Sequence, residues 1–308
     1  MLAAWLAILL TMEVAVLITL GVHWIGAGHS VSVVVGVCAA LAFLWRAGLV
    51  AFTMATARVD RGLGKGGAGK RLVVWTALWM RETVAMATAY LAMTIEPLRQ
   101  PRGARLAEGS GPLVVMVHGW LCNGAVWRPV VRRLRRTGWR DVHCITLSPV
   151  LGNIDDMAQH LGRLIAALQA GGQPRRLVLV THSMGGLVAR AWLRRLDRAA
   201  RETTTLVTIG CPHRGTRLAT LGPGVAARQM RLGSAWLGEL QASPGPAPAL
   251  TCIGSPTDNF IAPQEGAWLP GVPGFAVAGV GHFGLLRAAA TAEHVIAAYG
   301  SPPLAAVR

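Results

Sequence analysis

The chain has 308 residues, of which 53% are hydrophobic and only 14% are charged, and its formal net charge is +16. Soluble domains carry roughly 25% charged residues, so the composition indicates that part of the chain lies in a membrane. The length suits one large domain, or one domain with a substantial appendage. The five cysteines form no CxxC pair and no metal-ligand spacing, and we expect free thiols.

The positive charge comes almost entirely from arginine and favours anionic partners. It is accompanied by no zinc-finger spacing, no RNA-binding motif and no basic recognition helix. We therefore expect membrane phospholipid headgroups as the anionic partner, and no nucleic acid. A solvated arginine-rich surface without a specific partner explains the charge equally well.

The first 57 residues contain two apolar stretches, at residues 2–20 and 31–57, each long enough to cross a bilayer. The segment between them holds no lysine or arginine, whereas the glycine-rich loop at residues 58–71 is basic. Basic loops remain in the cytoplasm. The sequence therefore predicts a transmembrane hairpin over residues 1–57 of a bacterial inner membrane, with both of its ends in the cytoplasm.

A third apolar segment, at residues 72–95, carries Arg81 and Glu82 near its middle. Each such charge costs about 2.5–3.5 kcal/mol at the centre of a bilayer. This cost favours a helix that lies on the membrane or packs on the hairpin, and places the remainder of the chain in the cytoplasm. A third membrane span stays open, and would place it in the periplasm. We assign residues 58–111 to the basic loop, this helix and a linker.

From Pro112 onward, short apolar runs alternate with helical patterns, which is typical of an α/β domain with a mostly parallel sheet. We assign residues 112–308 to this domain. Residues 215–248 lack strand character, and we expect a cap of short amphipathic helices there, with an ordinary crossover helix as the alternative. The expected strands, about six in number, lie within residues 113–119, 142–148, 175–183, 204–210, 249–255 and 274–282.

Five short motifs follow one another in this half: VHGW, THSMGG, IGCPHRGT, PTDNFIAP and GVGH. In this order they resemble the α/β-hydrolase superfamily, and in particular the bacterial triacylglycerol lipases and esterases. The resemblance covers about residues 112–300 and implies the α/β-hydrolase fold, preceded here by a helical membrane region.

The resemblance also implies a serine hydrolase that cleaves carboxylic esters of lipid-like substrates through an acyl-serine intermediate, without metal or cofactor. A phospholipase, a thioesterase or an acyltransferase would use the same residues. An inactive hydrolase relative that serves as a membrane interaction module is the alternative outside enzyme chemistry. The sequence leaves the acyl chain length and the oligomeric state open.

The motif THSMGG resembles the strand-to-helix turn that presents a nucleophilic serine, here Ser183. Such a turn needs small residues two positions before and after the serine. Gly185 satisfies this requirement and Gly186 lets the following helix pack closely, whereas Thr181 stands where the usual G-x-S-x-G pattern has its first glycine. Threonine suits a strand but needs extra room.

A serine nucleophile needs a base, and the base needs an acid that orients it. In the family order the acid comes next, and Asp258 is expected in this role because it follows the end of a strand, with Glu265 in reserve. The base is expected to be His282, which has glycines on both sides, rather than His213 after an earlier strand or His294 inside the closing helix.

The oxyanion formed during ester cleavage needs N–H donors. The resemblance implies the backbone amides of Met184 and Trp120, with Leu121 as the alternate to Trp120. His118 and His182 are expected to support the two turns rather than to carry chemistry. We place the substrate pocket among His118, Leu121, His182 and His213.

Overall fold

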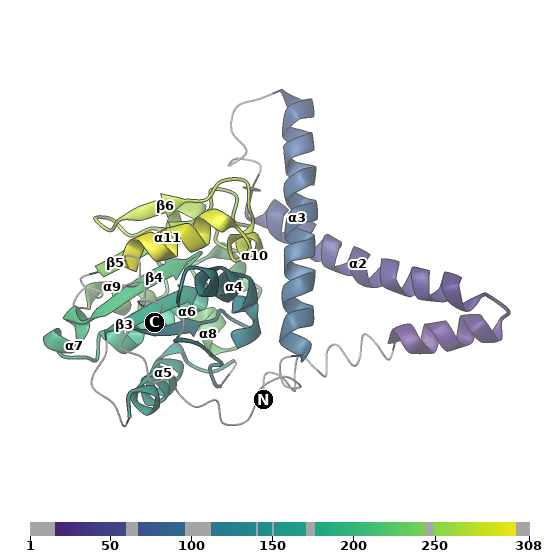
Figure 1. Ribbon diagram of the computed structural model, residues 1–308. Coiled ribbons are helices and arrows are strands. Elements are labelled where there is room, and N and C mark those ends of the chain that lie inside the picture. The colour runs from purple at the N-terminus through teal and green to yellow at the C-terminus, as the bar shows by residue number, and fades with distance from the viewer. Residues whose placement is uncertain are drawn as a thin grey trace.

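The computed structural model describes residues 16–59, 67–95, 112–139, 141–149, 151–170, 176–243 and 249–299 (Figure 1). Most of the first expected membrane segment, half of the basic loop and the whole linker at residues 96–111 lie outside the described residues.

The centre of the molecule is a six-stranded sheet in which every neighbouring pair is parallel. Its order is β2-β1-β3-β4-β5-β6. This confirms the expected α/β fold with about six parallel strands, although the last strand is only three residues long. The strands are β1 (Leu113–Val117), β2 (Val142–Ile145), β3 (Leu177–His182), β4 (Thr204–Ile209), β5 (Ala249–Gly254) and β6 (Gly274–Ala276).

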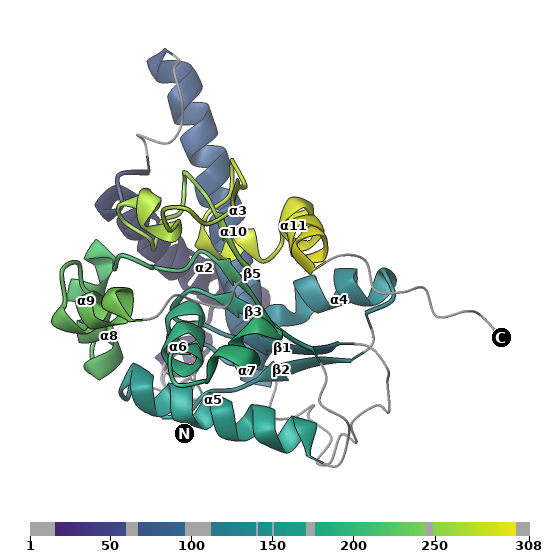
Figure 2. The ribbon, with the colours of Figure 1, turned by 90° about the vertical axis from the view of Figure 1, so that its left-hand side faces the viewer.

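Helices cover both faces of the sheet, so the central strands β1, β3 and β4 are buried along their whole length. In β1, Val114 and Met116 enter the hydrophobic cluster on one face, and Val115 and Val117 enter the cluster on the other. The helices α4 (Arg128–Arg136) and α11 (Ala289–Tyr299) lie over the first face; α5 (Ile154–Gln169) and α6 (Met184–Leu193) lie over the second (Figure 2).

The order of the strands reverses between β1 and β3: the chain moves outward from β1 to β2, then returns to β3 and continues through β6. In an open parallel sheet, ligands bind at such a reversal, beyond the carboxyl ends of the strands. The segments that follow β1 and β3 contain the HGW and HSMGG motifs. The topology therefore brings these two motifs together.

In the described part of the chain, three helices precede the sheet: Val16–Gly26, α2 (Val31–Thr56) and α3 (Ala68–Ile95). Among the described residues, only α2 is both long and apolar enough to cross a membrane, with a mean hydropathy of 2.2. It projects away from the sheet and its covering helices, and α3 crosses it (Figure 1). An N-terminal helix of this kind suits a membrane anchor or a signal sequence.

The third segment, α3, packs along the sheet domain and against α2. The indole nitrogen of Trp79 donates to the carbonyl oxygen of Ala47 at 2.7 Å, which joins α3 to α2. Near the other end, the side chain of Asn123 donates to the carbonyl oxygen of Met93 at 2.9 Å, which joins α3 to the domain. Glu82, one of its two central charges, is buried against the domain. Its position in the middle of an apolar segment is thus explained by a protein environment.

The remaining elements are short. Residues 216–243, within the expected cap, form three small helices above the carboxyl edge of the sheet: η4 (Arg217–Thr220), α8 (Val225–Gln229) and α9 (Ala235–Ala242). The others are η3 (Gly124–Trp127), α7 (Arg198–Glu202), η5 (Gln264–Ala267) and α10 (His282–Leu285).

Candidate active site

Ser183 occupies the turn between β3 and α6, where it is the N-cap residue of the helix. Its backbone has φ +55° and ψ −130°, a left-handed conformation that is uncommon outside glycine and costs energy. Gly119 lies directly against it, since a Cβ atom added to Gly119 would be 2.7 Å from the Cβ of Ser183. The strained turn and the bare glycine leave the hydroxyl free to face a pocket.

Small residues after the serine are required by close backbone contacts. A Cβ atom on Gly185 would lie 2.5 Å from the carbonyl oxygen of Val117, and one on Gly186 would lie 2.5 Å from Sγ of Cys211. Thr181 fits without such a conflict. It is fully buried, and its hydroxyl donates to the carbonyl oxygen of Val207 at 3.1 Å. The neighbouring strand thus satisfies the polar group that replaces the usual glycine.

The structure joins Asp258 and His282 in a buried pair. Nδ1 of His282 lies 2.8 Å from Oδ2 and 3.1 Å from Oδ1 of Asp258. The same carboxylate accepts backbone N–H groups from Phe260 at 2.8 Å and Ile261 at 2.9 Å. Gly210 packs against both side chains. Asp258 therefore fixes the orientation of the imidazole and favours the tautomer with a proton on Nδ1.

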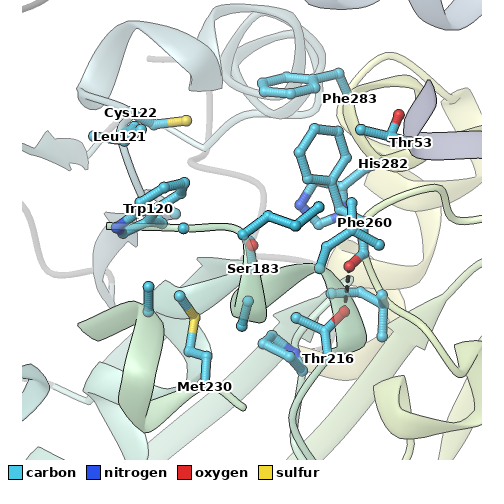
Figure 3. A pocket seen from close by; sticks show the side chains of 18 of the residues that line it. Thr53, Trp120, Leu121, Cys122, Ser183, Thr216, Met230, Phe260, His282 and Phe283 are labelled. Carbon is cyan, nitrogen blue, oxygen red and sulfur yellow. Dashed lines mark hydrogen bonds between the residues drawn. The ribbon is translucent and has the colours of Figure 1, made fainter. Parts of the chain in front are cut away.

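Ser183 and His282 line the same pocket, which has a volume of about 230 Å³ (Figure 3). Trp120 and Leu121 stand on one side of it, and Phe260 stands beside His282 on the other. The segment expected as a cap contributes further apolar wall, including Leu218, Leu221 and Met230. The pocket thus combines a serine, a histidine and a mostly apolar lining.

The N-terminal helices also line this pocket, although the sequence predicted only a membrane role for them. Leu49, Phe52 and Thr53 come from α2, and Tyr90 comes from α3. No motif marks these residues, because they lie in segments whose apolar character was already explained by a membrane. The signals that could have indicated a contact with the domain were Thr53 and Glu82, since each is a polar residue in an apolar helix.

The backbone amides expected as oxyanion donors come from two different segments of the chain. Met184 begins α6, so its N–H group belongs to the positive end of a helix dipole. Trp120 lies in the turn after β1, where Leu121 has a left-handed φ of +54°. Within the described part of the chain, no hydrogen-bond acceptor lies in range of the amides of Met184, Trp120 or Leu121. All three remain available as oxyanion donors.

His118 and His182 hold the turns around the site through buried hydrogen bonds. Nδ1 of His118 donates to the carbonyl oxygen of Gly119 at 2.8 Å, and its Nε2 accepts from the amide of Leu147 at 2.8 Å. Burial lowers the pKa of His118 to about 4, so it is neutral. Nε2 of His182 donates to the carbonyl oxygen of His282 at 3.3 Å, and burial, followed by the nearby His282, holds its pKa well below the usual value.

Two of the four residues expected around the substrate, Leu121 and His182, line the pocket, and two do not. His118 is enclosed by the turn it supports. His213 is buried behind the pocket, 3.0 Å from the hydroxyl of Thr208 and 3.4 Å from Nη1 of Arg190. Burial and the arginine charge hold its pKa well below the ordinary value. Its ring is occupied by these partners and does not reach the pocket.

The reserve acid, Glu265, lies elsewhere. It lines a second cavity of about 350 Å³ together with Arg58 and Arg217, and does not contact His282. Among the described residues, no group of three or more His, Cys, Asp or Glu side chains has the arrangement of a metal site.

Comparisons with known proteins agree with this fold. A family model described as a PGAP1-like alpha/beta domain matches residues 151–243. The pimeloyl-(acyl-carrier protein) methyl ester esterase of Aliivibrio salmonicida is 33% identical over 98 residues, which cover 32% of this chain and 36% of that protein. The corresponding esterase of Vibrio campbellii is 31% identical over 113 residues, or 37% of each chain.

The crystal structure of Aspergillus fumigatus lipase B superposes with a TM-score of 0.56 at 17% identity, covering 66% of this chain and 56% of the lipase. The chain spans just over a third of the length of the curated relatives it matches. By its fold, its family match and its relatives, the chain resembles the lipases and esterases of the α/β-hydrolase superfamily.

Proposed function

We propose that the protein is a serine hydrolase that cleaves carboxylic esters of lipid-like substrates. One observation carries the proposal: a serine held in a strained turn and an imidazole bonded to a buried carboxylate line one apolar pocket. The similarity to methyl ester esterases supports the same chemistry.

In the proposed reaction, Oγ of Ser183 attacks the ester carbonyl carbon while Nε2 of His282 takes the hydroxyl proton. Asp258 stabilises the imidazolium through the proton on Nδ1. The oxyanion of the tetrahedral intermediate accepts the N–H group of Met184 and one from Trp120 or Leu121. His282 then gives its proton to the leaving alcohol, and an acyl-serine remains. A water molecule repeats the sequence and releases the acid.

The lining of the pocket supports a substrate that resides in the membrane. Leu49 and Phe52 belong to the candidate membrane helix and line the pocket, yet 39% and 53% of their surfaces remain exposed. One side of these residues therefore faces the pocket and another faces outward. An acyl chain in the surrounding lipid could enter along α2 without crossing water, and its apolar area would be buried among apolar side chains.

The surface of α3 supports a position of the hydrolase half on the membrane. Its exposed residues Val73, Met80, Val84 and Leu91 are spaced by 7, 4 and 7 positions, which places them on one face of the helix. The opposite face is buried in the protein. We propose that this exposed apolar stripe lies at the membrane surface while α2 spans the bilayer, with the hydrolase half in the cytoplasm. The net charge of +16 suits anionic headgroups.

Fluorophosphonate labelling of the full chain in detergent tests the proposal. We expect covalent labelling of the wild type, mapped to the peptide containing Ser183 and lost in Ser183→Ala. Ser234→Ala is the matched control, because that serine caps α9 and donates to the carbonyl oxygen of Gln229 without lining the pocket. A folded wild type that is not labelled would refute the hydrolase proposal. Cleavage of p-nitrophenyl esters of increasing length then defines the acyl preference.

A further inference from the structure

The turn that carries His282 is held by a residue from outside the hydrolase domain. Glu82, in the middle of α3, accepts the backbone N–H groups of Phe283 at 2.7 Å and of Gly284 at 2.8 Å. These are the residues immediately after His282 in the first turn of α10. The N-cap residue of that helix, Gly281, has no side chain to satisfy them. Glu82 therefore supplies the missing cap from 200 positions away in the sequence.

The glycines on either side of His282 make room for this carboxylate. A Cβ atom added to Gly281 would lie 2.5 Å from Cδ of Glu82, and one on Gly284 would lie 3.1 Å from its Oε2. The GVGHFG motif is thus shaped to receive a side chain from α3. In the sequence, the glycines on both sides of His282 supported only its assignment as the base.

A second contact ties the same turn to α2. The amide of His282 donates to Oδ1 of Asn259 at 3.0 Å, and the side-chain nitrogen of Asn259 donates to the hydroxyl of Thr53 at 2.8 Å. Helix α3 therefore contacts the turn of His282 directly, and α2 contacts it through Asn259, in both cases by buried hydrogen bonds. Such contacts fix position more tightly than apolar packing does, because a displaced partner leaves a buried polar group unsatisfied.

We propose that Glu82 is a positioning residue for the reaction: by capping the turn at Phe283 and Gly284, it holds the imidazole of His282 in line with Ser183 and makes α3 part of the catalytic centre. This inference rests on the proposed hydrolase function.

The charge of Glu82 fits this role. Burial raises its pKa to about 7, while the two backbone N–H groups and the nearby His282 act in the opposite direction. A negative charge close to His282 attracts an imidazolium more than a neutral ring. In the proposed reaction, His282 becomes an imidazolium only when it takes the serine proton. Ionised Glu82 therefore stabilises the transition state more than the ground state, and this difference raises the rate.

Glu82→Gln tests the role with nearly unchanged volume. Glutamine has one oxygen, so one of the two N–H groups loses its acceptor and the charge disappears. We expect the rate constants of fluorophosphonate labelling and of short-ester hydrolysis to fall about 10- to 100-fold, the size of effect that a small displacement of a catalytic group produces. KM should change little, because Glu82 does not line the pocket.

Thr88→Val is the matched control. Thr88 lies on the same helix and accepts from Arg287 at 3.0 Å, so it also joins α3 to the domain, but it does not contact the His282 turn. We expect its labelling rate to equal that of the wild type. Both proteins are compared in detergent, and each rate is corrected for the folded fraction measured by tryptophan fluorescence.

The outcomes separate the two proposals. An unlabelled wild type would refute the hydrolase function itself. A labelled wild type with an equally fast, folded Glu82→Gln would refute only the role of Glu82, as would a loss shared with Thr88→Val. If Glu82→Gln does not fold, Glu82→Asp replaces it: the shorter carboxylate keeps the charge but cannot reach both N–H groups, and we again expect slower labelling with unchanged KM.

Discussion

Ser183 and His282 face the same pocket but are held by different parts of the chain. The turn of Ser183 is built from neighbouring strands: its amide donates to the carbonyl oxygen of Ile209 at 2.9 Å, and Gly119 packs on its side chain. The turn of His282 depends partly on Asp258 within the domain. It also depends on two residues of the N-terminal helices: Glu82, which bonds it directly, and Thr53, which bonds Asn259.

The turn of the proposed nucleophile is therefore held within the sheet domain, whereas the turn of the proposed base is not. A segment that by composition suggests only membrane attachment here supplies two buried polar contacts and part of the pocket wall. We therefore expect changes in the N-terminal helices to alter the base more than the nucleophile.

Removal of the base itself should have the largest effect. We expect His282→Ala to lower kcat/KM for a short ester by about 10⁴-fold or more, because serine without a general base loses nearly all of its reactivity. The control is His294→Ala, since His294 lies in α11, stacks on Phe275 of β6 and does not line the pocket. A His282→Ala protein that retains a tenth of the wild-type kcat/KM would exclude His282 as the base.

A methyl group on Gly281 should separate the base from its outside support. The added Cβ would lie 2.5 Å from Glu82 and 2.8 Å from Oδ1 of Asn259, so both partners must move. We expect Gly281→Ala to lower kcat about 10- to 100-fold, as expected for a misplaced catalytic group.

Gly238→Ala is the control for this substitution, because Gly238 lies within α9 with no atom near an added Cβ. Alanine there should stabilise the helix by roughly 0.5–1 kcal/mol and leave kcat unchanged. Equal kcat values for both variants and the wild type would mean that the His282 turn tolerates displacement.

The stability of the protein should depend on the ionisation of Glu82. Its pKa rises from 4.5 in the unfolded chain to about 7 in the fold, so between these pH values the folded state binds more protons. The contribution of Glu82 to stability is therefore fully present below about pH 4.5 and is lost as the pH rises to 7. Each pKa unit corresponds to about 1.4 kcal/mol, which gives a total of about 3 kcal/mol.

Thermal unfolding of wild type and Glu82→Gln across this pH range measures the contribution. His282 and Asp258, the other titratable groups near Glu82, are present in both proteins, so the difference between the two curves isolates Glu82. We expect the wild type to lose stability relative to the variant as the pH rises. A difference that does not change with pH would show that Glu82 has an ordinary pKa.

The sequence predicted much of the domain and little of its attachment. The parallel sheet followed from apolar runs such as those around β1 and β3, and motifs near strand ends led to Ser183, Asp258 and His282, because the carboxyl ends of parallel strands meet at one edge. His213 was expected to line the pocket, but a histidine after a strand can turn inward as well as outward. Its inward orientation depends on contacts with Arg190 and Thr208, which no local sequence pattern reveals.

The contacts of α3 could not be predicted for the same physical reason. In the sequence, Arg81 and Glu82 indicate only a cost of membrane insertion, because a single sequence does not show which residue pairs with a charge. In the structure Glu82 faces the domain and Arg81 is exposed, so adjacent residues in one helix meet different environments. The side that a helix presents to a distant turn depends on tertiary packing and not on its own composition.

The smallest expected effect concerns the pocket wall that α2 provides. Phe52→Ala removes apolar surface next to the acyl path, so we expect kcat/KM for a long-chain ester to fall by roughly threefold to tenfold, while a two-carbon ester is unaffected because it does not reach the wall. Phe43→Ala is the control, since Phe43 is exposed on the same helix but does not line the pocket. The ratio of long-chain to short-chain kcat/KM, measured in mixed micelles, separates substrate contact from general damage. If both esters lose activity equally, Phe52 helps to hold the site in place, as Thr53 does, and does not contact the acyl chain. If the rates for both esters are unchanged, acyl chains bind on the other side of the pocket.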